Sequence, residues 1–193
     1  MEIEERGILC SKEESDCKSW GALNSKENLS RLYFRLPKIK DDELRIKILH
    51  VGLCKSDWYA IQELWGPSMM FPLVPGHEIV GEIEKIGKDV KQYKEGEIVC
   101  VGVFRDCCGS CELCLDGMDN LCEDALFKYT YDPMIGGYST VIQIKDKFVF
   151  KCPTNLDISK VAPIMCAGVT SFSPIKRFGK EGNKCGIIGI GGL

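Results

Sequence analysis

The sequence lacks several features that mark common classes of protein. No apolar run in its 193 residues approaches the ~18 residues of a membrane-spanning helix, so we expect no membrane span. Lys and Arg total 25 against 28 for Asp and Glu, and the resulting formal charge of -3 provides no basic surface for nucleic acid. The N-terminus is acidic and has no apolar segment of the kind that a signal peptide requires. We therefore expect a cytoplasmic protein.

Cysteine is the residue that the sequence has in excess. Apolar residues make up 45% and charged residues 27% of the chain, which is ordinary for a globular protein and excludes a disordered, collagen-like or coiled-coil chain. Twelve cysteines are many for such a chain, and a reducing compartment disfavours disulfides. This number therefore indicates metal binding or catalysis. Five of them lie close together: Cys107, Cys108, Cys111, Cys114 and Cys122.

Four of these cysteines have the spacing of a structural zinc site. The pattern C-x2-C-x2-C-x7-C joins Cys108, Cys111, Cys114 and Cys122. Four thiolates with no open position complete a tetrahedral zinc shell, and the ion would stabilise a loop that has little apolar core of its own. The alternative is a loop of free thiols. Cys107 is left out, because adjacent side chains rarely bind one ion.

Short alternating segments separated by Gly and Pro predict a mainly β protein with short helices and a barrel-like domain. We expect strands at 32–36, 44–48, 78–86 and 97–103, and a hairpin formed by 138–144 and 147–151. Residues 1–20 are polar and have no periodicity, so we expect a poorly ordered leader. Towards the C-terminus we expect a helix at 167–178 and a short buried strand at 184–190.

A glycine cluster follows the last of these strands. Gly189, Gly191 and Gly192 match the opening of G-x-G-x-x-G, whose glycines bring the backbone close to a dinucleotide pyrophosphate. The third glycine would be residue 194, and the helix and further strands that complete such a domain are not in this sequence. By itself, the cluster is weak evidence for cofactor binding.

Three other segments carry candidate metal ligands. Cys54 follows a strand, His77 and Glu78 follow a Pro-Gly turn, and Cys166 precedes the expected helix. Each segment alone is weak evidence. A His after Pro-Gly is more often structural, and a Cys with apolar neighbours usually belongs to the core.

Together these segments resemble the zinc-containing medium-chain alcohol dehydrogenase family, and within it the N-terminal half of the cinnamyl alcohol dehydrogenase branch. The resemblance implies a GroES-like β-barrel domain with a structural zinc lobe at 21–165, after the leader, and the truncated start of a Rossmann cofactor domain at 166–193. It rests on several motifs in the family's order: Gly52–Asp57, Pro72–Gly81, Gly96–Gly102, the cysteine lobe, Gly136–Tyr138 and Ala162–Thr170.

The resemblance also implies a second, catalytic zinc site. Cys54, His77 and Cys166 match its ligands, and Glu78 matches a neighbouring carboxylate that binds the ion directly or alternates with water. Two thiolates and an imidazole leave a position open for substrate, where the ion acts as a Lewis acid on a carbonyl oxygen. Asp57 is either a partner that orients one of the ligands or an acid at a helix N-terminus.

Ser56 matches the family's hydroxyl that takes the alcohol proton, but two neighbouring residues depart from the pattern. Lys55 stands where the branch commonly has His, and it would either contact a cofactor phosphate or remain solvated. Tyr59 replaces the family's relay His, and a tyrosine hydroxyl, which ionises far above neutral pH, is a poorer proton shuttle. Three aromatic residues either line a substrate pocket or belong to the core: Trp58, Trp65 and Phe104.

The function implied by the resemblance is the interconversion of cinnamyl-type alcohols and aldehydes with NADP(H), with two zinc ions per chain. The expected partner is a small-molecule aldehyde or alcohol, and a homodimer is the candidate assembly. Two alternatives remain. One is a zinc-binding module without catalysis, because the cofactor domain is missing. The other is a GroES-like structural or interaction protein, which would have no need of the metal motifs.

Overall fold

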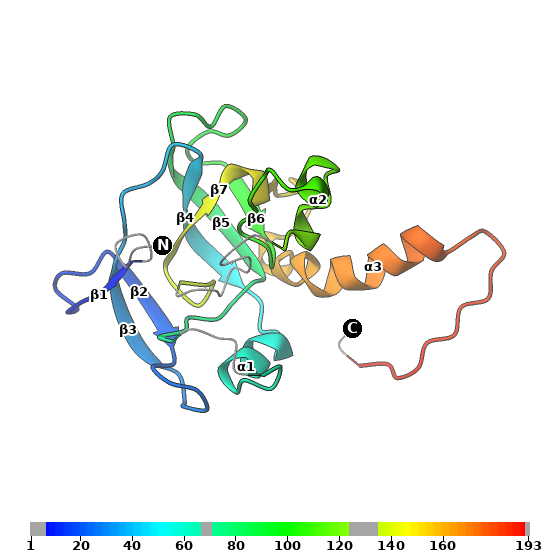
Figure 1. Ribbon diagram of the computed structural model, residues 1–193, viewed down its shortest axis with the longest axis horizontal. Helices are drawn as coiled ribbons and strands as arrows, with labels where there is room; N and C mark the ends of the chain where they lie inside the picture. Colours follow the sequence, from blue (N-terminus) through cyan, green and yellow to red (C-terminus); the bar gives the residue numbers. More distant parts are fainter. Residues whose placement is uncertain (1–6, 67–70, 124–134, 192–193) are drawn as a thin grey trace.

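The computed structural model describes residues 7–66, 71–123 and 135–191, and the described chain is mostly β (Figure 1). One antiparallel sheet has the strand order β1-β3-β2 and comprises β1 (Ile8–Leu9), β2 (Cys17–Gly21) and β3 (Ser30–Arg35). A second antiparallel sheet has the order β7-β4-β5-β6-β8 and comprises β4 (Glu43–Val51), β5 (Ile79–Ile86), β6 (Ile98–Val101), β7 (Val141–Lys145) and β8 (Val149–Lys151). Three α-helices lie in the described residues: α1 (Lys55–Ile61), α2 (Glu112–Leu115) and α3 (Ala167–Phe178). None of the described helices is both long and apolar enough to cross a membrane.

The strands form where the sequence alternates, because a strand with one buried face needs an apolar residue at every second position. In β3, Leu32 and Phe34 are buried and the residues at both ends of the strand are exposed. In β4, Leu44 and Ile46 are fully buried. The strands predicted at 32–36, 44–48, 78–86 and 97–103 are confirmed to within a few residues.

The five-stranded sheet is strongly curled. β7 pairs with β4 and β8 pairs with β6, so these two strands lie at opposite edges of the sheet. Only a three-residue 3-10 helix, Asp146–Phe148, joins them, and a connection of this length spans at most about 14 Å. The sheet must therefore curl so that its two edges approach each other, which confirms the predicted barrel-like domain. The hairpin predicted for 138–144 and 147–151 is wrong, because the two strands pair with different neighbours.

The poorly ordered leader predicted at 1–20 is wrong for the part of it that the structure describes. From residue 7 onward the chain forms β1 and β2, and β2 pairs with β3 along its whole length. Cys17 and Ser19 are buried, whereas Lys18 and Trp20 face the other way and are exposed. The alternation is present in the sequence, but a buried Ser hides it from a pattern based on hydrophobicity.

Helix α3 projects away from the β body, and the segment after it loops out beyond the end of the helix and then turns back (Figure 1). The helix has the predicted bounds, with Pro174 inside it, and none of its residues is buried. The buried strand predicted at 184–190 is wrong. The described residues 179–191 contain no strand, and Ile187, Ile188 and Ile190 are exposed. A strand needs a neighbour for its backbone hydrogen bonds, and the described chain offers none here.

This exposed C-terminal region leads us to expect self-association. The chain exposes 11895 Å² of surface, whereas a folded monomer of its mass exposes about 9,200 Å². We expect light scattering after gel filtration to give a mass that rises with concentration, because the apolar side chains of α3 are uncovered. Phe172→Glu, on α3, should restore a monomer, whereas Leu9→Glu, at another exposed site on β1, should not.

Two measurements on the wild-type chain would contradict this expectation. One is a constant monomer mass at every concentration. The other is slow amide hydrogen exchange at residues 187–190 in the monomer, because slow exchange there would mean that the chain itself pairs or covers this segment.

Candidate functional site

Four candidate metal ligands from distant parts of the chain meet at one end of the second sheet. Cys54 follows β4, His77 and Glu78 immediately precede β5, and Cys166 immediately precedes α3. Because β4 and β5 run antiparallel, the end of one strand lies beside the beginning of the other. One ligand atom from each of the four side chains lies within 4.8 Å of the others. The structure therefore brings together the residues that the sequence analysis grouped as a catalytic metal site.

Two glycines allow this convergence. Gly76 has a φ of 104°, which residues with a side chain rarely adopt, and a Cβ there would lie 2.7 Å from the backbone nitrogen of Tyr138. A Cβ on Gly52 would overlap the carboxylate of Glu78. Each glycine thus lets two segments approach closely enough to place a candidate ligand, His77 next to Gly76 and Glu78 against Gly52.

The buried carboxylate of Asp57 holds the surrounding segments together. Its Oδ1 accepts hydrogen bonds from the Gly76 N–H at 2.8 Å and from His77 Nδ1 at 2.9 Å. Its Oδ2 accepts from the Cys54 N–H at 3.2 Å and from the Tyr138 hydroxyl at 3.1 Å. Because a carboxylate only accepts, Nδ1 of His77 carries a proton, and Nε2 of the neutral ring has the lone pair that a metal would bind. Asp57 thus contacts a candidate ligand and also lies in the first turn of α1, and its role in orienting a metal ligand stays a prediction.

Tyr138 is a residue to which the sequence analysis gave no role of its own. Burial and the charge of Asp57 raise the pKa of its hydroxyl, so the group stays protonated and donates to the carboxylate. The only signal in the sequence is the Gly136-Gly137-Tyr138 motif, which does not indicate that the hydroxyl reaches Asp57.

The charges at this site fit a bound dication. Burial and the neighbouring Cys54 raise the pKa of the Cys166 thiol to about 12. Burial also raises the pKa of the Glu78 carboxyl. At Cys54, burial opposes ionisation, but hydrogen bonds from Ser56 and the proximity of His77 outweigh it and lower the pKa of the thiol. A divalent metal would supply the positive charge that lets both thiols and the carboxyl ionise together.

Three residues of α1 with predicted roles lie within five positions of the candidate ligand Cys54. Ser56 forms hydrogen bonds with the Cys54 thiol through its side chain and its backbone, so its hydroxyl lies at the ligand set. Lys55 is exposed, and its ammonium lies 5.4 Å from the centre of the Tyr59 ring. The roles expected for Lys55 in cofactor binding and for Tyr59 at the relay position stay predictions.

The structure places two of the three aromatic residues considered for a substrate pocket around Tyr59. Trp58 and Trp65 are about half exposed, and their ring centroids lie 5.7 and 5.8 Å from that of Tyr59. Phe104 lines a cavity of about 510 Å³, together with Phe148. An aromatic substrate pocket formed by the three side chains stays a prediction.

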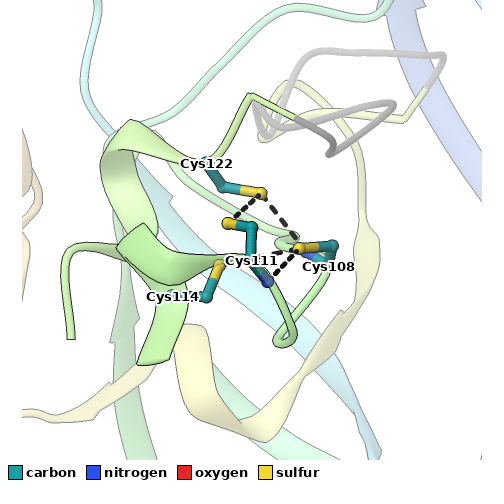
Figure 2. A group of neighbouring side chains, drawn as sticks. All are labelled: Cys108, Cys111, Cys114 and Cys122. Atoms are coloured by element: carbon teal, nitrogen blue, oxygen red, sulfur yellow. Dashed lines mark hydrogen bonds between the residues drawn. The ribbon is translucent and has the colours of Figure 1, made fainter. Parts of the chain in front are cut away.

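The second candidate metal centre is the cysteine lobe (Figure 2). The sulfurs of its four cysteines point toward one another and lie within 4.8 Å. The Sγ–Sγ distance is 3.9 Å between Cys108 and Cys114 and 4.0 Å between Cys111 and Cys122. A tetrahedron of thiolates about 2.3 Å from zinc has edges of about 3.8 Å. The donor set and its dimensions therefore fit a zinc ion.

Backbone geometry also favours a thiolate at Cys108 in this lobe. The N–H groups of Ser110 and Cys111 donate to the Cys108 sulfur at 3.4 and 3.3 Å, and they lower the pKa of that thiol to about 6. Cys114 and Cys122 are buried and pack into the main apolar core. The group of four contains Cys108 and not the adjacent Cys107, as the spacing argument assumed.

The glycine cluster lies in the exposed segment after α3. Gly189 has a φ of 75°, Gly191 is exposed, and Gly192 lies outside the described residues. No strand precedes these glycines in the described residues 179–191. The strand-turn-helix context of a dinucleotide fingerprint is therefore not formed here, and the role of the three glycines in cofactor binding stays a prediction.

Comparison with known sequences gives the chain relatives over most of its length. Residues 40–154, more than half of the chain, match the alcohol dehydrogenase GroES-like domain. Cinnamyl alcohol dehydrogenase 8 of Arabidopsis thaliana is 40% identical over 181 residues, which cover 89% of this chain and 50% of that protein. A protein of Fragaria ananassa named "Probable mannitol dehydrogenase" is 38% identical over 90% of this chain and 50% of its own length. The chain thus spans about half the length of the curated relatives it matches.

Solved structures agree with these sequence matches. A cinnamyl alcohol dehydrogenase from Sorghum bicolor superposes with a TM-score of 0.78 and 34% identity, over 84% of this chain and 48% of that one. The protein called CAD from Helicobacter pylori, solved in complex with NADP(H), gives a TM-score of 0.77 and 31% identity, over 83% and 48%. The predicted GroES-like fold and the family resemblance are confirmed, and the chain belongs to the alcohol dehydrogenase GroES-like domain family.

Proposed function

We propose that the chain is the metal-binding N-terminal half of a zinc-dependent alcohol dehydrogenase that interconverts cinnamyl-type alcohols and aldehydes with NADP(H). The convergence of Cys54, His77, Glu78 and Cys166, separate from an all-cysteine group, carries the proposal. Cys54, His77 and Cys166 leave a fourth position open for substrate when Glu78 gives way to water, whereas four thiolates close the shell, and this difference separates catalytic from structural zinc. The names of the relatives support the substrate class, and the NADP(H) complex of the Helicobacter pylori protein supports the cofactor.

Each side chain around the mixed site then has a chemical task. Zinc bound there supplies a Lewis acid for the oxygen of the alcohol or aldehyde. Glu78, which forms a hydrogen bond with Cys166, is placed to bind the ion or to give way to water. Asp57 orients the His77 ring by accepting a hydrogen bond from Nδ1, which leaves Nε2 to bind the metal. Ser56, hydrogen-bonded to Cys54, is placed to accept the proton of the alcohol.

Cofactor binding belongs, in this proposal, to a longer protein. We place the domain boundary at residues 165 and 166 and assign the contacts with NADP(H) to Lys55, Gly189, Gly191 and Gly192. Hydride transfer requires a complete cofactor domain, whose parallel strands are covered by helices on both faces. The coverage of about half of each relative supports this division.

A zinc-binding module without catalysis is the second candidate function. The observation that favours it is the exposed segment 179–191, which forms no strand around its glycines. A titration of the 193-residue chain with NADPH is a partial test between the two candidates. If the chain is only a zinc-binding module, NADPH should show no saturable binding to it. A longer protein or a chimera is then needed to show catalysis.

Zinc content is the first test of the proposal. We expect about two zinc ions per chain, one in each ligand set. Cys111→Ser should remove one ion and unfold the lobe, because the metal replaces an apolar core there. Cys166→Ser should remove the other ion with little loss of fold, and Cys10→Ser, far from both groups in the sequence, should remove neither. Atomic absorption and circular dichroism measure both effects, and folded protein without zinc would refute the proposal.

Asp57→Asn tests whether the buried carboxylate positions the metal ligands. The substitution keeps the size of the side chain but removes the charge that accepts from His77. We expect the affinity for zinc at the mixed site to fall about 10–100-fold, with zinc in the cysteine lobe unchanged, as measured by chelator competition. Asp16→Asn is the matched control, because Asp16 also accepts a backbone hydrogen bond, from Leu36, but at an exposed site. Equal zinc affinities of the mixed site in the two variants would mean that Asp57 acts only as a helix-capping residue.

Catalysis is tested in a chimera in which residues 1–165 replace the corresponding half of the Sorghum bicolor cinnamyl alcohol dehydrogenase. We expect the chimera to oxidise NADPH with cinnamaldehyde, and the 193-residue chain to give only background, because hydride transfer needs the nicotinamide held about 3–3.5 Å from the carbonyl carbon. In the chimera, Cys54→Ser and His77→Ala should abolish turnover. Zinc-dependent NADPH oxidation by the 193-residue chain alone would overturn this division of labour.

The same chimera identifies the proton acceptor. Ser56→Ala should slow turnover about 10²–10⁴-fold if the hydroxyl takes the proton of the alcohol. A mild effect of Ser56→Ala together with a faster Tyr59→His variant would instead assign proton transfer to solvent, and it would remove Ser56 from the proposed mechanism.

A further inference from the structure

A second group of potential ligand atoms lies beside the cysteine lobe. The sulfurs of Cys107 and Cys114 and a carboxylate oxygen of Asp119 all lie within 4.8 Å of one another. Cys107 donates a hydrogen bond to Asp119 Oδ1, with 3.3 Å between sulfur and oxygen. Cys107 and Cys114 are buried, whereas Asp119 reaches the surface. The four-thiolate centre uses only Cys114 of these three side chains.

We propose that Cys107, Cys114 and Asp119 bind a further thiophilic divalent ion, of which Zn²⁺ is the natural candidate, with the thiolate of Cys114 shared between the two ions of the lobe. The proposal rests on the four-thiolate zinc centre proposed above, because that ion keeps Cys114 deprotonated. Two sulfurs and one carboxylate oxygen select a soft or borderline metal over Mg²⁺ or Ca²⁺.

The geometry needs little adjustment to become tetrahedral. With metal–sulfur distances of about 2.3 Å and metal–oxygen distances of about 2.1 Å, the sulfur–oxygen edge of such a site is about 3.6 Å. The corresponding distance between Cys107 and Asp119 is 3.3 Å. Opening this pair slightly makes room for an ion, with water as the fourth ligand on the side of Asp119 that reaches the surface.

A side-chain cation already lies against these donors. Lys147 Nζ is 2.7 Å from Asp119 Oδ1 and 3.9 Å from the Cys107 sulfur. The Lys147 side chain is 51% exposed, and an exposed ion pair of this kind contributes little to stability. The ammonium can therefore move into solvent when a metal enters. On entry the Cys107 thiol becomes a metal-bound thiolate and releases one proton, so no oxidant or reductant takes part.

Equilibrium dialysis of the zinc-loaded chain against Zn²⁺, with the bound ions counted by atomic absorption, tests the proposal. Wild type should bind one ion more per chain at saturation than Cys107→Ser does. Cys10→Ser, which removes a cysteine outside the lobe, should bind as wild type does. Dialysis against Mg²⁺ should add no ion to any variant.

Two variants of the ion pair separate metal binding from a purely structural role. Asp119→Asn should weaken binding of the additional ion about 10–100-fold, whereas Lys147→Ala should strengthen it, because the competing cation is gone. If the ion pair only stabilised the lobe, both variants would lower its stability and neither would change the number of bound ions. Lys145→Ala is the matched control, because it breaks the neighbouring ion pair of Lys145 and Asp106 and should leave the additional ion in place.

The outcomes distinguish this proposal from the proposed function. A lobe without any zinc before dialysis would defeat both. A lobe with one zinc, but equal ion counts for wild type and Cys107→Ser, would overturn the shared-thiolate site alone. Weaker binding of the additional ion in Lys147→Ala would also overturn the shared-thiolate site, even if Cys107→Ser failed to fold.

Discussion

The buried carboxylate of Asp57 joins three segments that are distant in the sequence: the start of α1, the turn before β5 and the approach to β7. Burying a carboxylate is costly unless hydrogen bonds replace its lost hydration, and four donors surround this one. The bond to Nδ1 also fixes the orientation of the His77 ring. One side chain thus couples the packing of the barrel end to the geometry of the candidate metal ligands.

The curled five-stranded sheet provides the frame that this carboxylate needs. Because β7 and β8 lie at opposite edges but are joined by three residues, the edges are held together and the strand ends are fixed relative to one another. Cys54 follows β4 and His77 precedes β5, so both residues lie at the same end of two neighbouring antiparallel strands. This shared position brings the two side chains together. The cysteine lobe differs in character, because its α2 has only four residues and a bound ion would do what a core does elsewhere.

The two candidate centres were predictable from the sequence to different degrees. The ligands of the lobe, from Cys108 to Cys122, are close in sequence, so their spacing alone restricts the geometry. Cys54 and Cys166 are more than a hundred residues apart, and only the likeness to a family grouped them before the structure did. The sequence did not indicate that the hydroxyl of Tyr138 lies at one candidate centre or that the oxygen of Asp119 lies at the other. Tertiary contacts bring each of these atoms to its site.

The sequence by itself determined where β3, β4, β5 and β6 lie, because alternation along a strand such as β3 or β4 reflects the burial of one of its faces. Only the tertiary structure decided how strands pair. The same alternation fits β7 and β8 as a hairpin or as the two edges of a curled sheet, and it missed β2, where Ser19 is buried. Residues 184–190 have the composition of a buried strand, yet they are exposed because no neighbour in the described chain accepts their hydrogen bonds. A local sequence pattern indicates which face of a strand is buried. Strand pairing and the geometry of metal ligands depend instead on contacts between residues that are far apart in the chain.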